Sequence, residues 1–227
     1  MGESIVTRVK ICGITNLEDA QVAAAAGADY LGFILWPGSK RAITPAAAAI
    51  ICDTLCRQQP RPLLVGVFVN VSGAEMAAHM DACGFDLAQL HGEEVPALIG
   101  DPASPLYGRA YKGLRPTSLA EAEAEAEWYQ PPQRHPDHPA LLIDTFHPNL
   151  RGGTGQTTDW QMAAHLAAQI PGLMLAGGLT PDNVAQAVRQ VRPFAVDVAS
   201  GVESAPGRKD HKAIHRFVTA VRSISFP

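Results

Sequence analysis

The sequence predicts an α/β protein built as a single (β/α)8 barrel domain of eight parallel strands, spanning residues 1–227. Two observations predict this fold. Short apolar runs alternate with Ala-rich helical stretches eight times, and such strict alternation gives parallel strands with helices outside. The chain has 227 residues, a length at which eight units commonly close into a barrel. An open, doubly wound sheet is the alternative, because periodicity alone does not show closure.

Each expected strand is a short apolar run, and each is followed by a segment of helical character. In chain order the expected strands are Arg8–Ile11, Tyr30–Leu35, Leu63–Val69, Asp86–Leu90, Tyr107–Lys112, Ala140–Asp144, Leu173–Ala176 and Ala195–Val198. The expected helices are Leu17–Ala26, Pro45–Arg57, Gly73–Cys83, Glu94–Ile99, Ser118–Trp128, Thr157–Gln169, Pro181–Gln190 and Lys209–Ile224.

Local signals mark several helix ends. Thr44-Pro45, Ser118 and Thr180-Pro181 each offer a capping hydroxyl, and the two prolines suit the first helical position. Gly27 suits a left-handed cap after the first helix. The Pro-rich stretch 131–139 is too short for a domain linker and predicts a loop before the sixth strand.

Two further features favour a structural interpretation. The alternating Ala-Glu run 120–127 spreads its carboxylates around a helix, which predicts a solvated exterior helix rather than an acidic ligand site. Cys52 and Cys56 lie one helical turn apart, and we expect both to be small buried hydrophobic residues rather than metal ligands.

Composition narrows the class of partner. Hydrophobic residues make up 47% of the chain, the formal net charge is −4, and no long basic run occurs, which argues against nucleic acid or an acidic membrane as the main partner. The four cysteines form no Cys-x-x-Cys pair, so we expect no structural zinc. We find no signal-type apolar core and no run approaching the roughly 18 apolar residues of a membrane span, and we expect a cytoplasmic setting with free thiols.

Functional groups of such barrels gather at the carboxyl ends of the strands, so the residues there carry the argument. Glycines follow the seventh and eighth strands, at Gly177, Gly178 and Gly201. Glycine lets backbone N–H groups approach a phosphate closely, and loops after strands seven and eight often form a phosphate site together with a short extra helix. We therefore expect a phosphate site there, with Ser200–Ser204 as the extra helical turn.

Cys12 follows the first strand and Asp144 ends the sixth. Alone, each has a plain structural explanation: an inert buried thiol and a carboxylate that caps neighbouring N–H groups. In a barrel these strands lie across the mouth from one another, which suits an acid–base isomerisation in which one group takes a proton from carbon and the other protonates an oxygen. The thiol must act as thiolate and the carboxyl as acid, so we expect neighbouring charges to lower the first pKa and raise the second.

Three other side chains are candidate ligand contacts. Arg41 suits a two-pronged hydrogen bond to a carboxylate, although a solvated loop cation fits equally well. His91 suits either a substrate contact or a satisfied histidine at a strand end. Asp197 has the parity to reach a ligand hydroxyl or to pair with Lys10, which shares its face with Cys12.

Six motifs, in order along nearly the whole chain, resemble the phosphoribosylanthranilate isomerase family of tryptophan biosynthesis. They are Lys10-Ile11-Cys12-Gly13-Ile14-Thr15, Gln89-Leu90-His91-Gly92, Leu142-Ile143-Asp144-Thr145, Gly152-Gly153-Thr154-Gly155, Ala176-Gly177-Gly178-Leu179 and Asp197-Val198-Ala199-Ser200-Gly201-Val202-Glu203. The chain departs from the family pattern in 118–139 and, at the end of strand five, in Lys112-Gly113-Leu114.

The resemblance implies a (β/α)8 fold and an Amadori rearrangement without cofactor or metal. N-(5-phosphoribosyl)anthranilate becomes 1-(2-carboxyphenylamino)-1-deoxyribulose 5-phosphate. By analogy Asp144 is the general acid on the ribose ring oxygen, Cys12 is the base at C2 and Arg41 lies near the anthranilate carboxylate. The remaining substrate contacts expected are Gly177, Gly178, Ser200 and Gly201 at the phosphate, and His91, Gly153 and Asp197.

Two other functions compete with the isomerase. Another phosphosugar barrel, such as an epimerase or a synthase that closes an indole ring, is expected to show a metal cluster or catalytic lysines at its strand ends. A non-catalytic phosphate-binding barrel needs neither Cys12 nor Asp144. The expected partner is a small anionic substrate, and monomer and homodimer both stay open.

Overall fold

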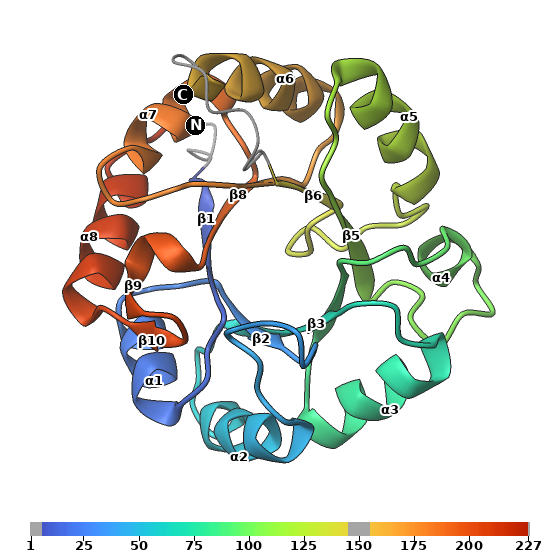
Figure 1. Cartoon of the computed structure of the whole chain (residues 1–227), viewed down its shortest axis with the longest axis vertical. Coiled ribbons are helices and arrows are strands. Elements are labelled where there is room, and N and C mark those ends of the chain that lie inside the picture. The colour runs from blue at the N-terminus through green and yellow to red at the C-terminus, as the bar shows by residue number, and fades with distance from the viewer. Residues whose placement is uncertain (1–5, 145–154, 227) are drawn as a thin grey trace.

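A computed structural model describes residues 6–144 and 155–226, with side chains left out for 155–159. Eight parallel strands pair in chain order and close into a barrel, and Figure 1 shows the helices as a ring around it. The strands are β1 Arg8–Cys12, β2 Tyr30–Ile34, β3 Leu63–Phe68, β4 Leu87–Leu90, β5 Ala110–Leu114, β6 Leu141–Asp144, β7 Leu173–Ala176 and β8 Ala195–Val198. The predicted (β/α)8 fold is confirmed.

The helices alternate with these strands, as predicted. They are α1 Leu17–Ala25, α2 Pro45–Cys56, α3 Gly73–Cys83, α4 Ala97–Gly100, α5 Leu119–Tyr129, α6 Gly155–Gln169, α7 Val184–Val191 and α8 His211–Arg222. A 3-10 turn, η1 Ser200–Val202, leads into a small antiparallel hairpin of β9 Glu203–Ala205 and β10 Arg208–Lys209. Among the described residues, no helix is long and apolar enough to cross a membrane.

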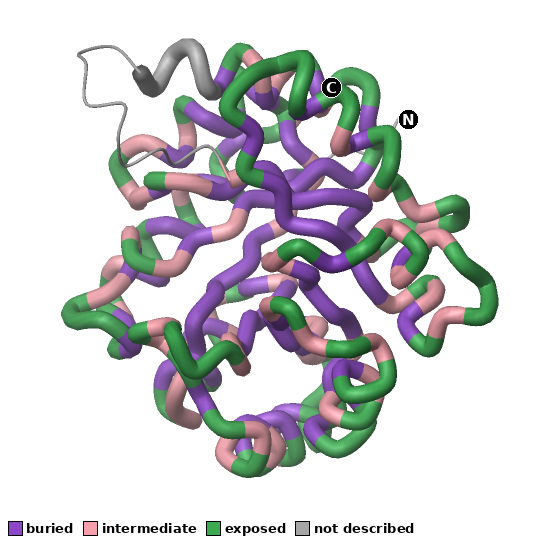
Figure 2. The backbone as a smooth tube through the Cα atoms, turned by 45° about the vertical axis from the view of Figure 1, so that its right-hand side comes forward, coloured by how far each residue is buried: buried purple, intermediate pink, exposed green. Residues whose placement is uncertain are grey.

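Alternation along each strand divides the core into two layers. Val9, Ile11, Leu31 and Phe33 point outward and belong to the large cluster between the strands and the helices. A smaller cluster fills the barrel interior with large side chains such as Tyr111. Figure 2 shows the consequence, with buried backbone concentrated in the strands and exposed backbone on the outer turns.

The same alternation turns Lys10 and Cys12 inward from β1. Backbone pairing places Lys10 beside Tyr30 on one side and beside Asp197 on the other, and Cys12 beside Gly32. At β6, Asp144 pairs with Ala176 of β7. The barrel register therefore brings the ends of β1, β6, β7 and β8 to one rim.

Several local predictions are confirmed. The hydroxyls of Thr44 and Ser118 accept the expected backbone N–H bonds at the starts of α2 and α5. Gly27 has φ +93°, the left-handed conformation expected after α1. The acidic helix α5 buries Ala122 and Ala126 against the barrel. Its glutamates lie on the exposed and half-buried positions between them, as expected for an exterior helix.

Other boundaries differ because polar side chains compete for the backbone. The helix expected from Pro181 starts at Val184, since the Asn183 side chain accepts from the Thr180 N–H. The helix expected from Lys209 starts at His211, with Asp210 as its cap. In both cases an Asx residue one or two positions beyond the expected start precedes the helix.

Three further predictions are wrong in detail. Strand five begins at Ala110 rather than Tyr107, because residues 104–109 form turns and Gly108 has φ +73°. The short helix before it starts at Ala97 rather than Glu94, since the Glu94 carboxylate instead accepts from the Gly92 and Asn70 N–H groups. Cys56 is exposed, whereas Cys52 is buried as expected.

Candidate active site

A cavity of about 330 Å³ opens at the carboxyl ends of the strands. Cys12 and Asp144 both line it, so the structure brings the two candidate catalytic groups to one space. Its other lining residues are Ile34, Trp36, Ser39, Arg41, Val67, Val69, Gln89, His91, Arg115, Leu142, Ala176, Asp197 and Ala199. The lining residues of β2 and β3, Ile34 and Val67, are apolar. Those of β1, β4, β6 and β8 include polar groups, so the cavity suits a ligand with one apolar and one polar part.

Cys12 is the last residue of β1 and is 5% exposed. Gly32 makes room for its thiol, because a Cβ at Gly32 would lie 2.7 Å from Cys12 Sγ. We expected charges to lower the pKa of this thiol. Instead burial raises the pKa of Cys12 above its ordinary value of 9.0, and the nearby ammonium groups of Lys10 and Lys209 oppose that rise only in part.

Asp144 is the last residue of β6, and its side chain is 25% exposed. The Arg115 Nε lies 3.8 Å from Asp144 Oδ2, which is an ion-pair distance rather than a hydrogen bond. Arg115 follows β5 directly and lines the same cavity. The sequence predicted no role at the end of strand five, because Lys112-Gly113-Leu114 matches the family pattern less distinctly than the other strand ends do, and it placed the end of that strand at Lys112 rather than Leu114.

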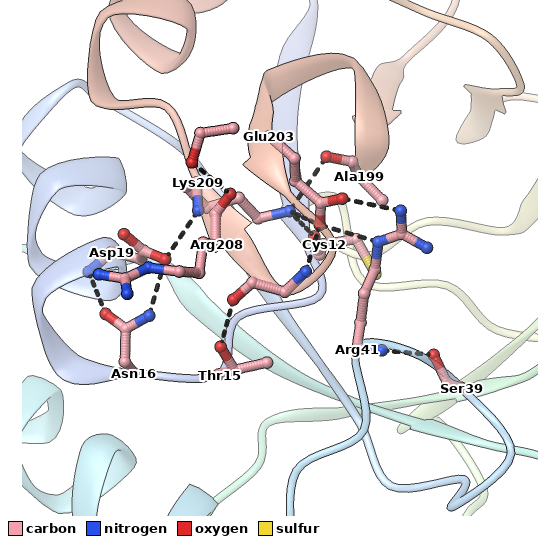
Figure 3. A network of polar contacts seen from close by, with 12 residues as sticks. Cys12, Thr15, Asn16, Asp19, Ser39, Arg41, Ala199, Glu203, Arg208 and Lys209 are labelled. Carbon is pink, nitrogen blue, oxygen red and sulfur yellow. Dashed lines mark hydrogen bonds and ion pairs between the residues drawn. The ribbon is translucent and has the colours of Figure 1, made fainter.

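Arg41 reaches the cavity from the loop between β2 and α2 and is held there by a carboxylate. Its Nε donates to Glu203 Oε1 at 2.8 Å and its Nη2 to Glu203 Oε2 at 2.7 Å (Figure 3). This bidentate bond raises the pKa of the Arg41 guanidinium. The described residues supply Nη1 with no acceptor, so the guanidinium keeps donors for an anionic ligand.

Lys209 connects this carboxylate to strand β1. Its Nζ donates to Cys12 O at 2.6 Å, to Ala199 O at 3.0 Å and to Glu203 Oε1 at 3.1 Å (Figure 3). The side chain is fully buried, and burial lowers the pKa of the Lys209 ammonium. Sequence reasoning placed Lys209 in the last helix and missed it, because a two-residue strand such as β10 has no periodicity to find.

Inside the barrel, Asp197 pairs with Lys10, one of the two alternatives that the sequence left open. The Lys10 Nζ donates to Asp197 Oδ1 at 3.1 Å and to Gln89 Oε1 at 2.9 Å. Asp197 also lines the cavity, so this pairing leaves it within reach of a ligand. Gln89 belongs to one of the family motifs, but the sequence does not predict its contact with a buried ammonium.

His91 lines the cavity as a neutral ring. Burial, together with the cations Arg115, Lys10 and Lys112, lowers its pKa to about 3. Its Nδ1 lies 3.3 Å from the Gln89 Nε2 amide, so Nδ1 is the acceptor and the proton belongs on Nε2. At physiological pH the imidazole therefore offers hydrogen bonds without carrying charge.

The glycine-containing loops after β7 and β8 lie against one another. Gly177 and Gly178 have φ +100° and +61°, a conformation that suits glycine. A Cβ at Gly201 would lie 1.9 Å from Leu179 O, so only glycine lets these two loops meet. Together with Ser200, these residues lie just beyond Ala176 and Ala199, which line the cavity; the glycines themselves do not.

Two expectations have a limited outcome. Residues 145–154, which include Thr145 and Gly153, lie outside the described residues. Within the described part of the chain, no three His, Cys, Asp or Glu side chains are grouped so as to hold a metal ion. The donor set around the cavity is one of ammonium, guanidinium, thiol and carboxyl groups, which suits proton transfer on an anionic substrate. The fold and this cavity define the class of protein: a (β/α)8 barrel with a partly polar cavity at the carboxyl ends of its strands.

Comparison with known proteins identifies the family. The model of the N-(5'-phosphoribosyl)anthranilate (PRA) isomerase family matches residues 9–220. A relative from Geobacter sp. (strain M21), an N-(5'-phosphoribosyl)anthranilate isomerase, is 45% identical over 97% of this chain and all of its own length. The chain belongs to the N-(5'-phosphoribosyl)anthranilate isomerase family, which confirms the resemblance found in the sequence.

Solved structures agree with this assignment. Phosphoribosyl anthranilate isomerase from Thermotoga maritima superposes with a TM-score of 0.79 at 36% identity, covering 96% of this chain and all of that one. A second isomerase structure, in complex with reduced 1-(o-carboxyphenylamino)-1-deoxyribulose 5-phosphate, gives 0.77 at 34% identity with the same coverage. The chain is thus an aldose–ketose isomerase of tryptophan biosynthesis.

Proposed function

We propose that Cys12 and Asp144 carry out the Amadori rearrangement of N-(5'-phosphoribosyl)anthranilate. The observation that supports this most is their placement on one cavity of about 330 Å³, from strands β1 and β6. Asp144 as acid protonates the ribose ring oxygen, and the bond from that oxygen to C1 breaks to leave a Schiff base. Cys12 as thiolate then takes the proton from C2, which gives an enamine that tautomerises to the ketone.

The cavity walls divide the substrate between them. Arg41 keeps donors for the anthranilate carboxylate, and its own position is fixed by Glu203. The aryl ring lies on the apolar wall of β2 and β3. The phosphate rests on backbone N–H groups of the two loops after β7 and β8. The residues proposed for it are Gly177, Gly178, Ser200 and Gly201.

His91 and Asp197 complete the proposed set. His91 is uncharged and donates through Nε2, which suits a sugar hydroxyl or the ring oxygen better than it suits a proton transfer. Asp197 accepts from a sugar hydroxyl while it stays paired with Lys10. The expected contact of Gly153 stays a prediction from the family motif.

The proposed setting is the cytoplasm, as monomer or homodimer. A small diffusible substrate, reduced thiols and the family's place in amino-acid biosynthesis support it. A structure of monomers generated from the dimeric isomerase of Thermotoga maritima is among the similar folds, so the fold exists in both states. Sedimentation of the purified chain at its cellular concentration decides between them.

The base assignment is tested by Cys12→Ala, with turnover followed as the loss of fluorescence of the anthranilate-linked substrate. We expect kcat to fall by about a hundred- to ten-thousandfold with a much smaller change in KM, since general base catalysis contributes that much. Cys52→Ala is the matched control, because Cys52 is a buried cysteine of α2 outside the cavity. Near-normal turnover of the Cys12 variant would exclude the thiol as base.

The pH dependence gives a second test of the same role. Burial raises the pKa of Cys12 above 9.0, and the active form is the deprotonated one. A rise in pH therefore increases the thiolate fraction, and the rate at which iodoacetamide alkylates Cys12 is expected to rise about tenfold per pH unit from neutral pH until the thiol titrates. An alkylation rate that is flat between neutral pH and pH 9.0 contradicts this.

A further inference from the structure

The proposed mechanism assigns no catalytic or binding role to Lys10. It is 0% exposed, and it points from β1 into the barrel interior two residues before Cys12. A buried ammonium is costly unless it is paired and hydrogen-bonded. Asp197 and Gln89 provide a carboxylate and an amide oxygen at 3.1 and 2.9 Å. Burial lowers the pKa of Lys10, but the electrostatic interactions with Asp197, Cys12 and Tyr111 together outweigh it, so the net pKa is raised and the group stays charged.

Two acceptors leave one of the three N–H groups of Lys10 without a hydrogen-bonding oxygen or nitrogen among the described residues. The thiol of Cys12 lies on the same side. A Cβ at Gly32 would lie 2.7 Å from Cys12 Sγ and 3.2 Å from Lys10 Cε, so the sulfur and the lysine stem lie against the same bare stretch of β2. Because Gly32 has no side chain, the side chains of Cys12 and Lys10 have room to lie next to each other.

The other buried lysine beside Cys12 is differently placed. All three N–H groups of Lys209 have oxygen acceptors, and one of these is the carbonyl of Cys12 rather than its thiol. Arg41 is turned to Glu203. The charged or titratable groups that act on Cys12 from the elements around it are Lys10, Asp197, Lys209, Arg41 and Tyr111. Of the two lysines, Lys10 is therefore the one with a donor left for the sulfur.

We propose that Lys10 is a positioning residue that stabilises the thiolate of Cys12 through its third N–H. The proposal rests on the proposed role of Cys12 as base, and it supplies what that role lacks. A fully buried thiol resists ionisation, and an adjacent ammonium held by Asp197 and Gln89 makes the thiolate accessible. Asp197 then has two opposing effects: it fixes the cation and it repels the thiolate.

The test measures thiolate formation directly and needs no turnover. Iodoacetamide reacts with the thiolate, forming the S–C bond with loss of iodide, and mass spectrometry of the Cys12 peptide gives the rate at each pH. In Lys10→Met we expect the midpoint of this profile to move up by about one unit or more, which is a roughly tenfold slower reaction below the midpoint. The pH profile of kcat is expected to move in the same direction.

Two further variants protect the test against misfolding. Lys10→Met leaves the Asp197 carboxylate buried and unpaired, whereas Lys10→Met with Asp197→Asn removes both charges and should still show the upward shift. Asp197→Asn alone should move the midpoint down, because it removes a charge that opposes the thiolate. A merely structural role of Lys10 instead predicts no upward shift in the folded double variant.

Lys112→Met is the matched control. Lys112 is a buried lysine of β5, paired with Glu94 at 2.7 Å, and it is not among the groups that act on Cys12. We expect it to lower the melting temperature without moving the alkylation midpoint. A shift of less than about half a unit in folded Lys10→Met, or an equal shift in Lys112→Met, overturns the proposal. Full turnover by Cys12→Ala would instead refute the base role and leave the alkylation result readable.

Discussion

The two ends of the barrel each hold a cavity, and the larger one is not the candidate site. The cavity at the amino end, about 470 Å³, is lined by the beginnings of strands, including Arg8, Tyr30 and Leu63. The cavity at the carboxyl end is about 330 Å³. The difference between them lies in how their charges are used rather than in their size.

At the amino end, charged groups are paired with each other across neighbouring elements. Arg61 forms a bidentate bond to Asp86 at 2.7 and 2.9 Å, Arg8 pairs with Asp137, and Asp29 pairs with Arg222 of α8 at 2.6 Å. At the carboxyl end, Arg41 and Lys10 are also paired, but each keeps an N–H beside the cavity or the thiol. The comparison teaches that neither ion pairs nor volume mark the functional end, which is distinguished by a thiol and a carboxyl group that line one cavity.

The largest expected effect that tests this comparison comes from Asp144→Asn. The amide keeps the shape of the carboxyl but has no acidic proton, so kcat should fall by about a hundred- to ten-thousandfold while substrate binding changes little. The fluorescence assay that follows substrate loss measures both. Asp182→Asn, an exposed aspartate at the start of the α7 region, is the control and should behave as wild type. Equal losses in both variants would show that the effect is not specific to the site.

A smaller effect is expected from Arg41→Gln. It removes the guanidinium that we propose for the anthranilate carboxylate, and loss of a charged hydrogen bond of about 1.5–3 kcal/mol raises KM by roughly tenfold or more with a lesser change in kcat. Arg57→Gln is the control, since Arg57 is an exposed arginine at the end of α2, paired with Asp53. An unchanged KM in Arg41→Gln would mean that the carboxylate binds elsewhere.

The smallest effect is expected at the amino end, from Arg61→Leu. The half-buried pair with Asp86 contributes about 1 kcal/mol, so the melting temperature should fall by roughly 2–4 °C in a chain of this size. Because this end takes no part in the proposed chemistry, kcat and KM should be unchanged. A loss of activity at unchanged melting temperature would remove the distinction between the two ends.

Alternation predicted the fold well because the barrel's units are local. Strands β7 and β8 and helix α3 begin and end at the predicted residues, and Gly27 and the caps at Thr44 and Ser118 follow from nearest neighbours. Boundaries failed where a side chain several residues away took a backbone group, as Asn183 does at Thr180.

The site was predictable only in part, for a related reason. Cys12 and Asp144 were found because strand ends are predictable from sequence and their rim is common to all barrels. The residues that hold them were not found: Lys209 and Arg115 lie far along the chain from the groups they touch. The predicted direction of the shift in the pKa of Cys12 was wrong. Burial is the largest cause of that shift, and burial depends on packing that no motif reveals.

The bond from Lys209 to the Cys12 carbonyl has a consequence for the order of events during synthesis. The two residues are 197 positions apart, and Asp197, the partner of Lys10, is 187 positions from it. At about 5–20 residues per second, a ribosome needs roughly 10–40 seconds to pass from one to the other. Throughout that interval the thiol of Cys12 in the nascent chain is not covered by β8 and β10. Cys12 is among the first side chains made, and its surroundings are among the last to close.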